Sequence, residues 1–463
     1  MGRLQARLEA ALRRARCAGS PVLASVTAAA PRDVDPVAMA ACSRREGEPW
    51  FCLEQPDRGG YAVAALGCAL ALEGHGPGRF ADVAARWRRA AASALADPLE
   101  GAPAGGGLVA VGGFAFADEG GGAPQWEGFA PASMLVPEVS LARGPGGATL
   151  TLTTAVAPDD TREGLMARVR GRLLELRQSE LPLLDPAPVG RHRVHSPIPP
   201  AHYEEAVAAA VARIRRGEIE KVVLSREVEV RAPAAYDPAA LLGLLRAEFG
   251  SCYVFAVGRG ACTLLGASPE LLVRREGQRA STVALAGSIG RSADPAVDDH
   301  LGERLLRSDK DRSENAIVAR RIMRELRPHA VWVTAPPEPG LVRVANVQHL
   351  ALPIRAQLRE PLDAIELAGL LHPTPAVGGE PRERASGLIP ALEGLERGWY
   401  AGPVGWTDAA GDGEFCVALR CALLRDRDAR LYAGCGIVRD SDPAAELAET
   451  EVKLGALLPL LAG

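Results

Sequence analysis

Short strand-like runs joined by tight turns constrain the fold of this chain more than any other feature of its sequence. Residues 133–143 and 148–156 alternate between apolar and polar side chains around Gly144-Pro145-Gly146-Gly147, a pattern typical of a β-hairpin. Similar runs recur in both halves of the chain, and hairpins outnumber strand–helix–strand units. The sequence therefore predicts a mainly antiparallel α+β architecture with helices outside the sheets.

The composition of the chain excludes several classes of protein. With 463 residues, of which 48% are hydrophobic and 24% charged, the chain can bury a large core. The net charge of −4 gives no reason to expect nucleic acid as a partner. The nine cysteines include no C-x-x-C pair, which argues against a zinc site or a disulfide framework and favours a reducing cytoplasm. Because no apolar run approaches the ~20 residues that span a bilayer, we expect a cytoplasmic protein without a membrane segment.

One proline-rich stretch without periodicity, residues 181–200, is interpreted as a linker. We therefore expect an N-terminal half over residues 1–180 and a C-terminal half over residues 201–463. Helical periodicity predicts the longer helices over residues 80–96, 158–178, 201–216 and 297–327.

The last fifth of the chain combines a glycine-rich turn with a charged helix. A strand-like run at 429–433 ends in Gly434 and Gly436, which we interpret as a loop before a helix. One stripe of that helix is apolar and formed by Leu447, Leu454, Leu458 and Leu461. A second stripe carries Glu446, Glu449 and Lys453. Two carboxylates one turn apart could hold a hard cation such as Mg²⁺ through oxygen, and the alternative is a solvated face with one ion pair.

Two ionisable residues occur next to apolar strands. Residues 221–226 carry apolar side chains at consecutive positions, so both faces of this predicted strand are expected to be buried. Lys221 at its start either extends to water or lies in a site where burial lowers its pKa, as a general base requires. Glu270 follows a proline turn between two apolar runs, and is either a buried acid with a raised pKa or an ordinary charge at a strand end.

Arg420 is the strongest single-residue signal for ligand binding. Residues 415–424 are predicted to form a strand, and Arg420 lies on one of its faces among small side chains. A buried guanidinium requires an anionic partner, and a bidentate carboxylate suits it, although a structural ion pair is the alternative. In the predicted helix at 297–327, Asp311 and Glu314 lie one turn apart and by themselves are typical of a solvated surface.

Eight motifs occur in one order along the chain. They are Lys221-Val-Val-Leu-Ser-Arg226, Ala267-Ser-Pro-Glu270, Leu285-Ala-Gly-Ser288, Asp309-Lys-Asp-Arg-Ser-Glu314, Leu371-His-Pro-Thr-Pro-Ala376, Tyr400-Ala-Gly-Pro-Val-Gly-Trp406, Ala433-Gly-Cys-Gly-Ile-Val438 and Glu446-x-x-Glu449. In this order they resemble the chorismate-utilising enzymes, and most of all the isochorismate synthases of menaquinone and siderophore pathways. The resemblance is close over residues 200–460 and looser in the first half, where it rests on residues 112–116 and 135–138.

The resemblance implies a fold and a set of roles. The fold is α+β, with two stacked, largely antiparallel β-sheets and helices on the outside. Lys221 matches the lysine that activates water, and Glu270 matches the acid that protonates the departing hydroxyl. The implied Mg²⁺ ligands are Glu314 and Glu449, with Glu446 and Asp311 close by. The residues implied to contact the substrate are Gly287, Ala376, Val377, Tyr400, Arg420, Gly434 and Lys453.

The implied reaction is the Mg²⁺-dependent isomerisation of chorismate to isochorismate, by addition of water at C2 and loss of the C4 hydroxyl. One alternative is a salicylate synthase, which shares these residues and then eliminates pyruvate. Another is a relative that binds chorismate without catalysis. Relatives that use ammonia are disfavoured, because those making anthranilate lack a lysine at position 221 and those making aminodeoxychorismate carry one where this chain has Ala286. The resemblance is compatible with a monomer, since monomers are common in the group.

Overall fold

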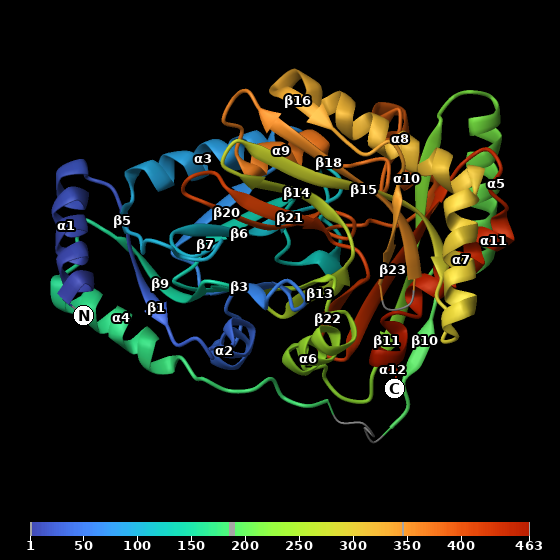
Figure 1. Cartoon of the computed structure of the whole chain (residues 1–463). Coiled ribbons are helices and arrows are strands. Elements are labelled where there is room, and N and C mark those ends of the chain that lie inside the picture. Colours follow the sequence, from blue (N-terminus) through green and yellow to red (C-terminus); the bar gives the residue numbers. More distant parts are fainter. Residues whose placement is uncertain (1, 185–189, 345–346, 463) are drawn as a thin grey trace.

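Two β-sheets stacked face to face form the centre of the molecule (Figure 1). The computed structural model describes residues 2–184, 190–344 and 347–462. Within these ranges the larger sheet has 13 strands and the smaller one 10. Every strand pair in the described part of the chain is antiparallel except that of β1 with β5 at one edge of the larger sheet. The predicted fold of two stacked, largely antiparallel sheets with outer helices is confirmed.

The larger sheet has the order β10 (Arg193–His195), β11 (Lys221–Arg231), β23 (Asp428–Ile437), β22 (Cys421–Arg425), β13 (Cys262–Ser268), β12 (Tyr253–Arg259), β2 (Trp50–Gln55), β3 (Tyr61–Leu66), β8 (Val139–Gly144), β9 (Gly147–Val156), β1 (Val22–Ala30) and β5 (Leu95–Asp97), with β19 (Gly379–Glu380) beside β11. The smaller sheet has the order β16 (Ala330–Thr334), β18 (Val347–Leu358), β15 (Arg279–Gly290), β14 (Leu271–Glu276), β21 (Gly413–Val417), β20 (Pro403–Asp408), β6 (Val109–Phe114), β7 (Ala132–Val136) and β4 (Leu70–Gly74), with β17 (Gly340–Arg343) beside β18.

Both halves of the chain contribute strands to both sheets. In the larger sheet β12 pairs with β2, and in the smaller sheet β20 pairs with β6. Phe255 of β12 and Phe415 of β21 belong to one buried apolar cluster that includes residues of both sheets. Of the predicted linker, residues 185–189 lie outside the described residues, and the division of the chain at 181–200 stays a prediction.

The helices lie on the outer faces and at the ends of the two sheets (Figure 1). Those packed on the smaller sheet are α3 (Arg79–Ser93), α7 (Pro295–Arg307), α8 (Asp309–Leu326) and α9 (Ala364–Leu371). Those packed on the larger sheet are α1 (Gly2–Ala18), α2 (Pro36–Ser43), α4 (Arg162–Glu175), α5 (Pro200–Arg215), α6 (Pro238–Glu248), α10 (Arg382–Glu393) and α11 (Pro443–Leu454). The short helix α12 (Leu458–Ala462) and the 3₁₀ turns Pro124–Trp126 and Arg327–His329 complete the described elements.

Two predicted helices are interrupted in the structure. The single helix predicted at 297–327 is wrong, because Ser308 adopts an extended conformation between α7 and α8 and accepts a hydrogen bond from the backbone N–H of Asp311. The continuous C-terminal stripe is also wrong, because α11 ends at Leu454 and Gly455 follows as its C-cap. Periodicity alone missed both breaks because a cap leaves the spacing of apolar residues unchanged.

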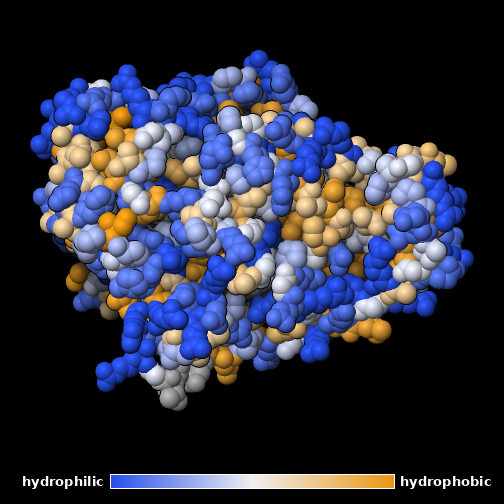
Figure 2. Space-filling view, turned by 180° about the vertical axis from the view of Figure 1, so that it is seen from behind, coloured by the Kyte–Doolittle hydropathy of each residue, from blue (hydrophilic) through white to orange (hydrophobic). Residues whose placement is uncertain are grey.

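The surface combines hydrophilic residues with smaller apolar areas, as the view from behind shows (Figure 2). The exposed large apolar side chains include Leu174 of α4, the neighbours Val331 and Trp332 of β16, and Val452 of α11. Among the described residues, no helix combines the length and apolar character needed to cross a membrane.

We expect Ser308→Ala to destabilise the protein by about 1 kcal/mol, because the first turn of α8 loses its N-cap. Urea unfolding of the variant and the wild type measures this difference. Ser313→Ala, an exposed position inside α8, is the matched control and is expected to be neutral or slightly stabilising. If residues 297–327 formed one continuous helix, Ser308→Ala would stabilise the protein instead.

Candidate active site

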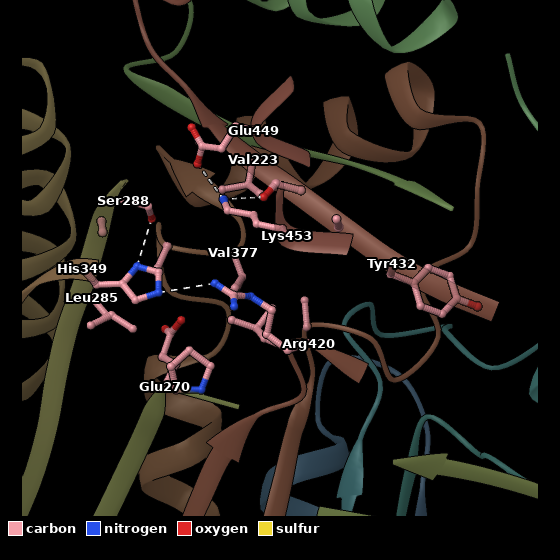
Figure 3. A pocket seen from close by; sticks show the side chains of 18 of the residues that line it. Val223, Glu270, Leu285, Ser288, His349, Val377, Arg420, Tyr432, Glu449 and Lys453 are labelled. Atoms are coloured by element: carbon pink, nitrogen blue, oxygen red, sulfur yellow. Dashed lines mark hydrogen bonds and ion pairs between the residues drawn. The ribbon is translucent and has the colours of Figure 1, made fainter. Parts of the chain in front are cut away.

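A cavity lies at the end of the molecule where β11 and β23 of the larger sheet face β15 and β18 of the smaller one (Figure 3). Ten of the predicted site residues line it, namely Glu270, Gly287, Glu314, Ala376, Val377, Tyr400, Arg420, Gly434, Glu449 and Lys453. The other three predicted residues, Lys221, Glu446 and Asp311, are not part of the lining but lie next to residues that are.

Lys221 is the first residue of β11 and its side chain is fully buried. Its Nζ lies 2.8 Å from Oε1 of Glu314, which α8 carries. The side chain therefore does not extend to water, which was one of the two interpretations that the sequence allowed. The buried ammonium or amine group stands beside the cavity wall and next to a carboxylate.

The glycines predicted to form a loop lie inside a strand. β23 continues through Gly434 and Gly436 to Ile437, and Gly436 pairs with Val223 of β11. A Cβ atom at position 436 would lie 2.2 Å from Oε1 of Glu314 and 2.7 Å from Cε of Lys221. Glycine is therefore required there for space, because two functional side chains cross directly over the strand.

Glu270 follows β13 and projects into the cavity below Arg420 (Figure 3). Its backbone N–H donates to Oγ of Ser268 at 3.2 Å, and the hydroxyl of Thr374 hydrogen-bonds its carboxyl group. Burial raises the pKa of Glu270 to about 8, although the charge of Lys221 and the Thr374 bond both act to lower it. The carboxyl group is therefore protonated at neutral pH and available as a proton donor.

The sequence pattern predicted that Arg420 lies on one continuous strand. This prediction is wrong. The chain leaves the smaller sheet at the end of β21, passes through Arg420 with a φ of 46°, and enters the larger sheet as β22. The alternation of side chains is the same before and after this crossing. The sequence pattern alone therefore could not reveal that the chain changes sheets here. The crossing places the Arg420 side chain between the sheets, where it lines the cavity.

His349 is a cavity residue that the sequence analysis missed. It lies on β18, with Nε2 at 3.4 Å from Nη2 of Arg420 and Nδ1 at 2.9 Å from Oγ of Ser288 (Figure 3). Burial and the charge of Arg420 lower its pKa well below the usual value, so the imidazole is neutral. Because a guanidinium only donates, Nε2 accepts and Nδ1–H donates to Ser288. The available signal was the polar pair Gln348-His349 directly before the apolar run at 350–354.

At the far end of the cavity, two carboxylates each pair with a lysine. Glu449 lies 2.8 Å from Lys453, and Glu446 lies 3.0 Å from Lys310. Burial would raise the pKa of Glu449, but the Lys453 ammonium outweighs it and the pKa falls below its usual value. Lys453 also donates to the carbonyl oxygen of Gly434 at 2.9 Å. Of the stripe that the sequence predicted, only Glu449 and Lys453 pair with each other.

The acidic side chains at this end of the cavity supply the oxygen ligands that suit a hard divalent cation. Donor atoms of Glu446, Glu449 and Cys435 lie within 4.8 Å of one another, and Lys310 interacts electrostatically with Glu446, Glu449 and Glu314. Burial raises the pKa of the Cys435 thiol, so it stays protonated and leaves the carboxylates as ligands. Carboxylate oxygens are the ligands that Mg²⁺ prefers, and the lysines beside them balance their charge here.

Comparison with known proteins accounts for this combination of residues. The sequence model of the family described as chorismate binding enzyme matches residues 9–462. The chain belongs to this family. It is 38% identical over 459 residues to the salicylate biosynthesis isochorismate synthase of Pseudomonas aeruginosa, and the match covers 98% of this chain and 93% of that protein.

Solved structures of relatives have the same fold as this chorismate binding enzyme. The menaquinone-specific isochorismate synthase of Escherichia coli superimposes with a TM-score of 0.79 at 28% identity, over 98% of this chain and 100% of that one. A putative 2,3-dihydroxybenzoate-specific isochorismate synthase of Bacillus anthracis gives a TM-score of 0.71 at 29% identity, over 91% and 98% of the two chains.

We expect Glu270→Gln to make this chorismate binding enzyme more stable at alkaline pH. The pKa of Glu270 is about 8 in the folded protein against an ordinary value of 4.5, so the folded wild type loses stability as pH rises from 4.5 towards 8. The neutral amide avoids this loss. Urea unfolding across this range should give a difference that grows with pH and vanishes near pH 4.5.

The matched control for this measurement is Glu276→Gln, which changes an exposed carboxylate on β14. It is expected to leave the pH dependence of stability unchanged. Equal pH profiles for the wild type and Glu270→Gln would show that Glu270 titrates normally.

Proposed function

We propose that this protein converts chorismate to isochorismate with Mg²⁺ as its cofactor. The observation that carries the proposal is one cavity that has a protonated acid, Glu270, in its lining and a fully buried lysine, Lys221, directly behind the lining residue Glu314. Its family membership and the names of its relatives support chorismate as the substrate. The cytoplasmic location and the monomeric state stay predictions.

Cationic groups on one side of the cavity suit the two carboxylates of chorismate. Arg420 and Lys453 both line the cavity, and the small residue Gly434 lies on the strand between them. A guanidinium can bind a carboxylate through two parallel hydrogen bonds, and an ammonium acts as a point charge beside it. Ala376, Val377 and Tyr400 also line the cavity and add mainly apolar surface, which suits the ring of the substrate.

The reaction requires one proton to be removed and one to be supplied. The proposed mechanism requires Lys221 in its neutral amine form, which takes a proton from water while the water oxygen forms a bond to C2 of the ring. The double bonds shift, the C4–O bond breaks, and Glu270 gives its proton to the departing hydroxyl, which leaves as water. Each proton-transfer group is expected to contribute roughly 10²–10⁴ in rate.

The proposed Mg²⁺ ligands are Glu314 of α8 and Glu449 of α11, with Glu446 beside them and Asp311 one turn before Glu314. A bound Mg²⁺ would neutralise the ring carboxylate and act as a Lewis acid and template. Lys221 lies 2.8 Å from Glu314 and Lys453 lies 2.8 Å from Glu449, the two proposed ligand carboxylates.

The direct test incubates the purified protein with chorismate, with and without Mg²⁺, and separates the products by chromatography. We expect isochorismate in equilibrium with chorismate only when Mg²⁺ is present. Lys221→Ala and Glu270→Ala should each abolish turnover while the circular dichroism spectrum stays that of the wild type. More than a tenth of the wild-type rate in either variant contradicts the assigned roles. Salicylate with stoichiometric pyruvate would place the protein with the salicylate synthases, and no product would indicate a binding protein.

Mg²⁺ binding can be tested without turnover by isothermal calorimetry. We expect Glu449→Gln to weaken binding strongly, because a ligand oxygen loses its charge. Glu451→Gln is the matched control, since this residue lies two positions further along α11 and pairs with Arg226 outside the cavity. Equal Mg²⁺ affinity of the Glu449→Gln variant and the wild type would exclude Glu449 as a ligand.

A further inference from the structure

Along one edge of β11, the strand that begins with Lys221, side chains take the place of a neighbouring strand. β11 pairs with β23 along its whole length from Val222 to Arg231 on one side. On the other side, within the described residues, β19 reaches only Val222 and β10 begins to pair only at Glu229. The buried backbone groups between these two contacts need other hydrogen-bond partners.

A buried ion pair supplies two of these partners. Arg397 donates from Nη2 to the carbonyl oxygen of Val223 at 3.0 Å, and Oε1 of Glu393 accepts from the N–H of Ser225 at 2.7 Å. The N–H and C=O groups of alternate residues in an antiparallel strand point to the same side. The guanidinium and the carboxylate therefore take the places of the donor and the acceptor of a neighbouring strand.

Arg397 also binds the turn that precedes β19 and lines the cavity. Its Nη1 donates to the carbonyl oxygen of Val377 at 2.7 Å, and the N–H of Val223 donates to the carbonyl oxygen of Gly378 at 2.7 Å. The same turn carries Thr374, whose hydroxyl hydrogen-bonds Glu270. One guanidinium thus connects the strand of Lys221 to the turn that holds the partner of Glu270.

The guanidinium is held rigidly from several directions. Its Nε lies 3.0 Å from Oε2 of Glu393, and its Cζ lies 4.3 Å from the ring centre of Phe116. Arg397 is 4% exposed and Glu393 also 4%. In such a buried site the planar guanidinium, with its several N–H donors, can adopt only one orientation. A lysine ammonium cannot reproduce this set of hydrogen bonds.

We propose that Arg397, held by Glu393, is a positioning residue that fixes the strand of Lys221 relative to the turn of Thr374, and thereby the base relative to the acid. This inference rests on the proposed function. A pair that served stability alone would affect unfolding and not turnover, because apolar replacements deprive the Val223 carbonyl and the Ser225 N–H of these partners but leave the catalytic groups in place in the folded protein. A pair that positions catalytic groups also lowers kcat when it is replaced.

The test therefore uses the double variant Glu393→Leu/Arg397→Met, which removes both charges together. We expect kcat to fall by about 100-fold, because small misplacements of reacting groups have effects of that size. KM should stay close to the wild-type value, since Arg420, Lys453 and Gly434 are unchanged. The alkaline limb of the pH–rate profile should move to higher pH, because Glu270 loses the Thr374 hydrogen bond that lowers its pKa.

The matched control replaces another buried pair, Arg172 with Glu48, whose side chains are 5% and 7% exposed in the N-terminal half. Arg172→Met/Glu48→Leu is expected to leave kcat unchanged. Should the first double variant fail to fold, Arg397→Lys takes its place, with the same expected loss of kcat. A wild-type kcat in either Arg397 variant, or an increase in KM as large as the loss of kcat, overturns the positioning role.

Hydrogen exchange separates this inference from the proposed function. The amide of Ser225 should exchange faster in the Arg397 variants than in the wild type and in the Arg172 control, whatever the substrate is. Unchanged exchange would contradict the positioning role even if the wild type converts chorismate. Faster exchange in the variants, combined with a wild type that does not convert chorismate, would contradict the proposed function alone.

Discussion

Charge buried between two β-sheets is the constraint on which the rest of this structure depends. Lys221, Lys453 and Arg397 each lie within hydrogen-bonding distance of a carboxylate in or beside the cavity. Removing one partner of such a pair leaves an uncompensated charge, which is far more costly than the small net stability of the intact pair. The pairs therefore fix side-chain positions more than they stabilise the fold. The cavity keeps its shape because its charged side chains have few other partners with which they could pair.

Close approach of the helices to the sheets makes this arrangement possible. Glu314 comes from α8, which packs on β15, and Glu449 comes from α11, which packs on β23. At Gly287 of β15 a Cβ atom would lie 2.8 Å from Cβ of Asp311, and the φ of 82° also favours glycine. Together with Gly436 on β23, this residue makes room for the two carboxylates of α8, Asp311 and Glu314.

The buried carboxyl group of Glu270, the proposed proton donor, lowers the stability of the fold. Among the residues that the structure describes, none forms an ion pair with Glu270, and its pKa of about 8 reflects the energy needed to ionise it there. The same burial that opposes its charge keeps the carboxyl group protonated at neutral pH. Active sites commonly combine such destabilised groups with rigid surroundings, and here the surroundings are strands of both sheets and the turn that carries Thr374.

The sequence by itself determined the fold class, the family and the residue types of the site. Alternation and turn chemistry are local properties, so the antiparallel α+β class followed from them, and the ordered motifs were enough to indicate Lys221, Glu270 and Arg420 as site residues. Tertiary structure decided the rest, because pairing depends on contacts between residues far apart in the chain. It placed the crossing between the sheets at Arg420, made Gly436 a strand residue under Glu314, and gave Glu446 a partner, Lys310, that lies 136 positions away. It also revealed His349 and Arg397, whose importance depends on the groups that surround them and not on any local pattern.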